Sequence, residues 1–114
     1  MKKLILTVLL VLCLALPAMA GDVVISSGLT TSDRLIATGN CYYHGMELIS
    51  GASTAVVVIY DAITISGTSV TKVQCPTANA YCSAPLPFGV EVFTGIYADV
   101  TGTGAAYTVY YRCK

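Results

Sequence analysis

The stretch from Asn40 to Leu48, NCYYHGMEL, gathers the residue types best suited to chemistry. It holds His44, the one histidine of the chain, three residues after Cys41 and three before Glu47. A thiolate or a carboxylate beside an imidazole can support nucleophilic or general acid–base catalysis. Along an extended strand, however, an odd separation places two side chains on opposite faces. Neither pair could therefore act together unless a β-bulge intervened.

Gly45 offers a place for such a bulge. A bulge at this glycine would bring Met46 and Leu48 onto the same face as Cys41, while His44 would point outward as an ordinary polar strand residue. The chain has no second imidazole and no G-x-S-x-G motif, and none of its six acidic residues is distinguished by its local sequence. We therefore expect a protein that is not an enzyme.

Four cysteines lie beyond residue 40, and their spacing argues against a metal or cofactor site. Neither a C-x₂-C zinc knuckle nor a C-x-x-C-H haem motif is present. An even number of cysteines in an exported chain indicates two disulfides, for which three connectivities are open. The turn-forming segment 76–81 favours a bond between Cys75 and Cys82. Cys41 would then pair with Cys113 at the last strand.

Residues 1–20 have the pattern of a cleaved secretory signal peptide. Two lysines precede an apolar run over residues 4–16, and a small-x-small site ends at Ala20. The run is too short to span about 30 Å of hydrocarbon, and Pro17 interrupts it. Cleavage would leave a single domain, residues 21–114, without a stable membrane anchor, in the periplasm or outside the cell.

The predicted mature chain carries six acidic and four basic residues, a formal charge of −2. It has no basic patch that could neutralise phosphates. Nucleic acid is therefore not an expected partner.

Short runs of β-branched and aromatic residues separated by Gly, Ser, Pro and Asn predict an all-β protein without a convincing helical stripe. Such a series indicates a small antiparallel β-sandwich, or a barrel-like domain, stapled by the two disulfides. The expected strands are Val23–Ser26, Arg34–Ala37, Cys41–Ile49, Ala55–Ile65, Ser69–Cys75, Val90–Val100 and Ala105–Cys113.

Eight tyrosines and no tryptophan are present in the chain. Most of these tyrosines are expected to be half-buried strand residues, because aromatic residues are preferred in strands. Some could instead form an exposed contact surface for a sugar, a peptide or another copy. The candidate contact residues are Tyr42, His44, Tyr97 and Tyr110.

A resemblance appears in the second half of the chain. Three segments carry it and follow one another along the chain. They are Val57-Val58-Ile59-Tyr60-Asp61, Pro85-Leu86-Pro87-Phe88-Gly89, and the segment from Gly95 to Tyr111 with its T-G-T-G turn and final T-V-Y-Y. Over roughly Ser53 to Tyr111 the chain resembles small β-sandwich structural proteins of phage and prophage virions. The resemblance implies a β-sandwich with an assembly role, here in an exported, disulfide-bearing form.

Self-association has support from the residues as well. The segments 56–60 and 107–111 combine high β-propensity with low charge, so an uncovered edge would invite another strand. The apolar segment 21–29 could insert into a neighbour, or it could be the first strand of its own sandwich. We expect a secreted structural or surface-assembly subunit that could self-associate into a polymer or filament, and whose partners are other copies of itself or a surface component. The alternative is a soluble module that binds a glycan or peptide through exposed tyrosines.

Overall fold

The computed structural model describes residues 23–114 of the chain, so the predicted signal peptide lies outside the described residues. Eight β-strands form two four-stranded antiparallel sheets, and the all-β prediction is confirmed. Within the described range there is no helix long and apolar enough to cross a membrane. The strands are β1 (Ile25–Ser26), β2 (Arg34–Thr38), β3 (Cys41–Ile49), β4 (Ala55–Asp61), β5 (Thr68–Cys75), β6 (Tyr81–Val92), β7 (Gly95–Thr101) and β8 (Ala106–Cys113).

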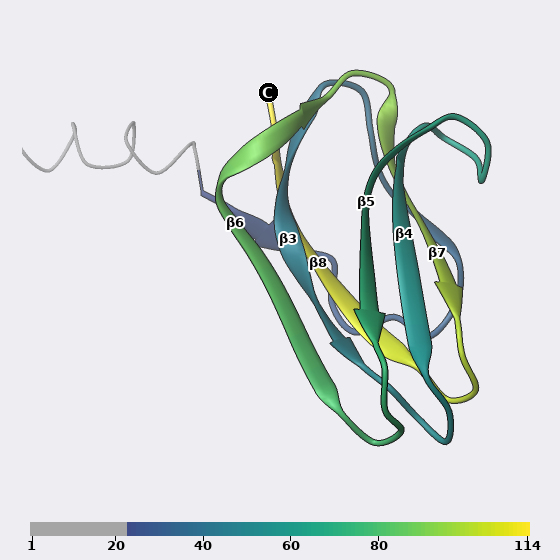
Figure 1. Ribbon diagram of the computed structural model, residues 1–114. Coiled ribbons are helices and arrows are strands. Elements are labelled where there is room, and N and C mark those ends of the chain that lie inside the picture. Colours follow the sequence, from purple (N-terminus) through teal and green to yellow (C-terminus); the bar gives the residue numbers. More distant parts are fainter. Residues whose placement is uncertain (1–22) are drawn as a thin grey trace, which may run out of the picture.

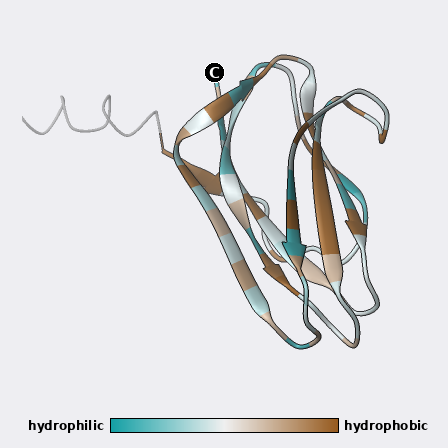
Figure 2. Cartoon of the chain, in the orientation of Figure 1, coloured by the Kyte–Doolittle hydropathy of each residue, from teal (hydrophilic) through white to brown (hydrophobic). Residues whose placement is uncertain are grey.

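The two sheets pack face to face as a sandwich (Figure 1). Sheet A has the order β1-β8-β3-β6, and sheet B has the order β2-β7-β4-β5. Inward-pointing side chains from both sheets form one core, because successive residues of a strand point to opposite faces. Figure 2 shows the contrast between β4, which is apolar along most of its length, and β6, which alternates along its length. The largest buried side chains are Tyr43, Tyr107, Met46, Leu48, Ile59, Ile96, Val57, Val92 and Val109.

A bulge interrupts β3 at the predicted glycine. The pairing register of β3 shifts between Tyr43 and Gly45 against both of its neighbours, β6 and β8. Gly45 has a φ of 112°, and a Cβ at this position would lie 2.9 Å from the Cα of Pro85 and still closer to the carbonyl oxygen of Ala84. Only glycine fits here. The bulge prediction is confirmed, since Met46 is buried like Tyr43 despite the odd separation between them.

The long strand β6 is the main feature that the sequence pattern did not predict. The pattern predicts a turn over residues 76–81, no strand over residues 82–89 and one strand over Val90–Val100. Instead β6 ends at Val92, and a turn separates it from β7. β6 tolerates Pro85 and Pro87 because it is an edge strand that pairs only with β3, so part of its backbone needs no hydrogen-bond partner.

The turn between β6 and β7 is held by a carboxylate from β4. Asp61 Oδ1 accepts hydrogen bonds from the backbone N–H groups of Phe93 and Thr94, at 3.1 and 2.8 Å, and from that of Gly95 at 3.3 Å. β4 therefore ends at Asp61 rather than continuing to Ile65 as predicted. Desolvation opposes ionisation of Asp61, but the three N–H groups together lower its pKa.

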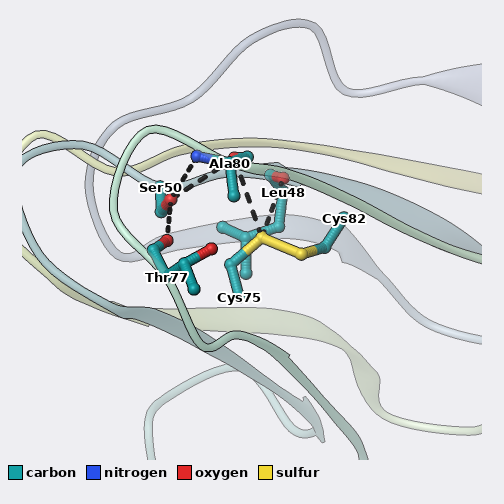
Figure 3. Close-up of a disulfide and its surroundings, with 6 residues drawn as sticks. All are labelled: Leu48, Ser50, Cys75, Thr77, Ala80 and Cys82. Carbon is teal, nitrogen blue, oxygen red and sulfur yellow. Dashed lines mark hydrogen bonds between the residues drawn. A yellow bond between two sulfur atoms is a disulfide. The ribbon is translucent and has the colours of Figure 1, made fainter.

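Both predicted disulfides are present. Cys41–Cys113 joins the neighbouring strands β3 and β8 within sheet A, whereas Cys75–Cys82 joins the end of β5 in sheet B to the start of β6 in sheet A. Figure 3 shows the second bond beside Ser50, whose buried hydroxyl donates to the Thr77 carbonyl at 2.6 Å and accepts from the Ala80 N–H at 2.8 Å. Two disulfides are consistent with an oxidising, extracellular or periplasmic location.

Removing the two disulfides separately should have unequal effects on stability. In the chain-entropy model, a bond that closes a separation of 72 residues contributes about 4 kcal/mol, and one that closes 7 residues contributes about 2.5 kcal/mol. Cys41→Ala with Cys113→Ala should therefore lower the free energy of unfolding more than Cys75→Ala with Cys82→Ala. Urea unfolding of both variants measures the difference. The opposite order would show that the link between the sheets outweighs loop closure.

Gly45→Ala should destabilise the domain by at least about 2 kcal/mol, because a Cβ would enter the backbone of β6 at a positive φ. Gly28→Ala is a matched control. Gly28 also has a positive φ, 75°, but its Cβ would meet nothing within 4 Å. Its cost should be limited to about 1 kcal/mol of backbone strain. Equal losses for the two variants in urea unfolding would contradict the structural role of the bulge.

Candidate contact surface

The four predicted contact residues do not lie on one surface. Tyr42 and His44 on β3 and Tyr110 on β8 lie on the outer face of sheet A. Tyr97 on β7 lies opposite Tyr60 on β4, on the outer face of sheet B. Because the core separates these faces, Tyr97 cannot share a contact with the other three within one copy.

His44 is half-buried beneath β6 on the outer face of sheet A. In the pairing of β3 with β6, Tyr43 lies opposite Val90 and Gly45 opposite Pro85. The four residues Leu86–Gly89 therefore lie opposite His44 alone and loop out over its ring as an excursion of β6. His44 Nδ1 lies 3.2 Å from the carbonyl oxygen of Leu86, and a Cβ on Gly89 would lie 3.0 Å from the ring. The buried Nε2 has no hydrogen-bond partner within residues 23–114. His44 therefore lies on the outer face as predicted, but its ring is partly covered by β6.

The structure assembles neither of the two catalytic pairs considered for His44. Cys41 is buried on the inner face and bonded to Cys113. Glu47, which a regular strand would place on the face opposite His44, shares the outer face because the bulge shifts the alternation by one residue. His44 nevertheless bonds to Leu86, while the carboxylate of Glu47 bonds elsewhere.

Two tyrosines from neighbouring strands converge on Glu47. The hydroxyl of Tyr110 on β8 donates to Glu47 Oε2 at 3.0 Å, and Tyr81 at the start of β6 also donates to this carboxylate. The hydrogen bond from Tyr81, and next that from Tyr110, lower the pKa of Glu47, so the group is ionised at neutral pH. We call Tyr81, Glu47 and Tyr110 the Glu47 cluster.

The sequence did not indicate this cluster, because Tyr81 was assigned to a turn and Glu47 was considered only beside His44. The side chains of Tyr81 on β6 and Tyr110 on β8 each reach across to the Glu47 carboxylate on β3, so both rings lie along the surface of the sheet. Tyr81 is 60% exposed. The result is a partly aromatic surface around one negative charge.

A second group occupies the other end of the same face. The guanidinium of Arg112 lies 4.3 Å from the ring centre of Tyr42, and the ammonium of Lys114 lies 5.3 Å from it. Lys114 also forms an ion pair with Glu91 at 2.8 Å. Its hydrogen bond to Glu91 raises the pKa of Lys114 and lowers that of Glu91. These positive charges are therefore already engaged.

The outer face of sheet B combines apolar residues with a pair of carboxyl groups. Val58 on β4 lies between Lys72 on β5 and Asp99 on β7. Asp33 Oδ1 accepts a hydrogen bond from the Val100 N–H at 2.8 Å. Desolvation raises the pKa of Asp99, and the neighbouring charge and hydrogen bond of Asp33 raise it further.

No group of three or more His, Cys, Asp or Glu residues arranged to hold a metal ion occurs in residues 23–114.

The carboxyl pair should make stability depend on pH. Because the folded pKa of Asp99 is raised, the folded chain holds this proton more tightly than the unfolded chain. Stability is therefore lost as the pH rises above the ordinary carboxyl value of 3.8 and through the raised pKa. Asp99→Asn should remove this loss and raise the urea midpoint at neutral pH.

Asp61→Asn is the matched control with the opposite sign. The lowered pKa of Asp61 stabilises the fold above the ordinary value of 3.8, and this contribution is lost as the pH falls through the folded pKa. Asp61→Asn should cost about 1–2 kcal/mol at neutral pH, because three N–H groups lose a charged acceptor. Urea midpoints between pH 3 and 8 measure both effects. A destabilised Asp99→Asn variant at neutral pH would contradict the assignment.

Comparisons of the chain with protein-family models, with curated proteins and with solved structures find no match.

Proposed function

We propose that the protein is an exported, non-catalytic structural subunit that assembles with other copies of itself. The observation that carries this proposal is the loosely attached apolar segment at the start of the described chain. Val23, Val24, Ile25 and Leu29 are exposed, with Leu29 68% exposed. Exposed apolar side chains gathered in one short segment are typical of a surface that is covered in an assembly.

The segment follows β8 through few contacts. Only Ile25 and Ser26 form the strand β1. Beyond β1, the Ser27 N–H donates a hydrogen bond to the Val109 carbonyl on β8 at 2.9 Å. Thr30 then bridges to Tyr107. A second copy could supply the same segment to β8 with the same contacts, so exchange would cost little and could join copies in a chain.

Other properties of the chain agree with this role. The disulfides suit an oxidising compartment outside the cytoplasm. The signal-like residues 1–20 would direct the chain there, and the resemblance to virion structural proteins also favours assembly over catalysis. Assembly of this kind needs no cofactor.

Disulfide trapping tests whether the first strand is exchanged. Ile25 lies opposite Tyr111, so Ile25→Cys with Tyr111→Cys should form a bond across β1 and β8. If copies exchange the strand, oxidised protein should give a ladder of covalent oligomers on non-reducing gels. Light scattering and negative-stain images of the unsubstituted residues 21–114 should show the corresponding polymers. A strictly monomeric protein that gives only the intrachain bond would contradict the proposal.

A further inference from the structure

The Glu47 cluster presents an uncompensated negative charge on the outer face of sheet A. Glu47 accepts hydrogen bonds from Tyr81 and Tyr110, and it forms no ion pair with a basic residue within residues 23–114. Tyrosine hydroxyls stabilise the carboxylate but leave its charge in place. A carboxylate flanked by aromatic rings attracts a cation, because both the charge and the ring faces favour it.

Lys72 differs from the basic residues on the opposite face. Arg112 and Lys114 are engaged at the ring of Tyr42. Lys72 is exposed on β5 and forms no hydrogen bond, ion pair or ring contact with the described residues. It is therefore free to bind a group outside its own chain.

The surroundings of Lys72 are apolar along β4, and the carboxyl groups of Asp99 and Asp33 lie on the other side of Val58. Lys72 lies opposite Val58, and Val56 and Tyr60 continue along β4 on the same outer face. These side chains are only half-buried, although β4 is a central strand of its sheet. A central strand that is apolar on both faces is usually covered on both sides. Within one copy, only the inner face of β4 is covered by the other sheet.

We propose that the Glu47 cluster of one copy docks on the Lys72 face of a second copy. The ammonium of Lys72 would meet the carboxylate of Glu47, while its aliphatic stem and the β4 stripe lie against the tyrosine rings. Because the two faces lie on opposite sides of the sandwich, this pair cannot form within one chain. The contact is heterologous, so it repeats and stacks sandwiches into an open series. This inference rests on the proposed self-assembly and adds to it a contact separate from the exchange of the first strand.

Charge reversal tests the contact. Glu47→Lys alone and Lys72→Glu alone each place two like charges at the interface, so each should raise the concentration needed for assembly by at least about tenfold. An equimolar mixture of the two variants should assemble close to the unsubstituted level. In the mixture, every contact can again join opposite charges, provided that the two variants alternate. Light scattering across a concentration series gives the readout.

Glu91→Lys is the matched control. It makes the same charge change on the same face, but at the ion pair with Lys114, away from the Glu47 cluster. This variant should assemble at a concentration close to that of the unsubstituted protein. Circular dichroism of all three variants checks that each remains folded, and added salt should weaken assembly by screening the pair.

The outcomes separate this inference from the proposed function. If the unsubstituted protein assembles but the two reversed variants do not restore each other when mixed, the docking contact is overturned and self-assembly stands. If the unsubstituted protein never assembles, both proposals fail. If it is monomeric and binds an immobilised oligosaccharide array, with the binding lost in Tyr110→Ala, the Glu47 cluster is a glycan site and the docking proposal is overturned.

Discussion

The bulge at His44 and Gly45 is the constraint on which sheet A depends. β3 is paired on both sides, with β6 and with β8, so its alternation sets which side chains of three strands face the core. The extra residue allows Tyr43 and Met46 to be buried together. It exists because glycine alone fits a positive φ with the β6 backbone against its Cα.

The edge strand β6 forms in a segment whose residues, two prolines among them, have a low intrinsic preference for β-strands. Its start is tied to β5 by the bond between Cys75 and Cys82, and its end is fixed by Asp61 at the following turn. Between these points its proline-containing excursion packs over His44. Residues distant in the sequence therefore position this strand, and local sequence preference alone does not predict it.

The same bulge determines the character of the outer face. By shifting the alternation, it moves Glu47 to the outside, where Tyr81 and Tyr110 reach it from the flanking strands. The opposite side of the sandwich carries Lys72 beside the outward residues of β4. That face also carries Asp99, on the other side of Val58 from Lys72.

The sequence alone determined the all-β class, most of the strands, the place of the bulge and both disulfides. These features depend on local signals: alternation, a glycine within a strand, and the number and spacing of cysteines. The tertiary structure decided that Tyr81 begins a strand, that His44 is covered, and that Tyr97 lies apart from Tyr42 and Tyr110. Strand order and sheet membership arise from long-range pairing, and neither can be read from a segment considered by itself.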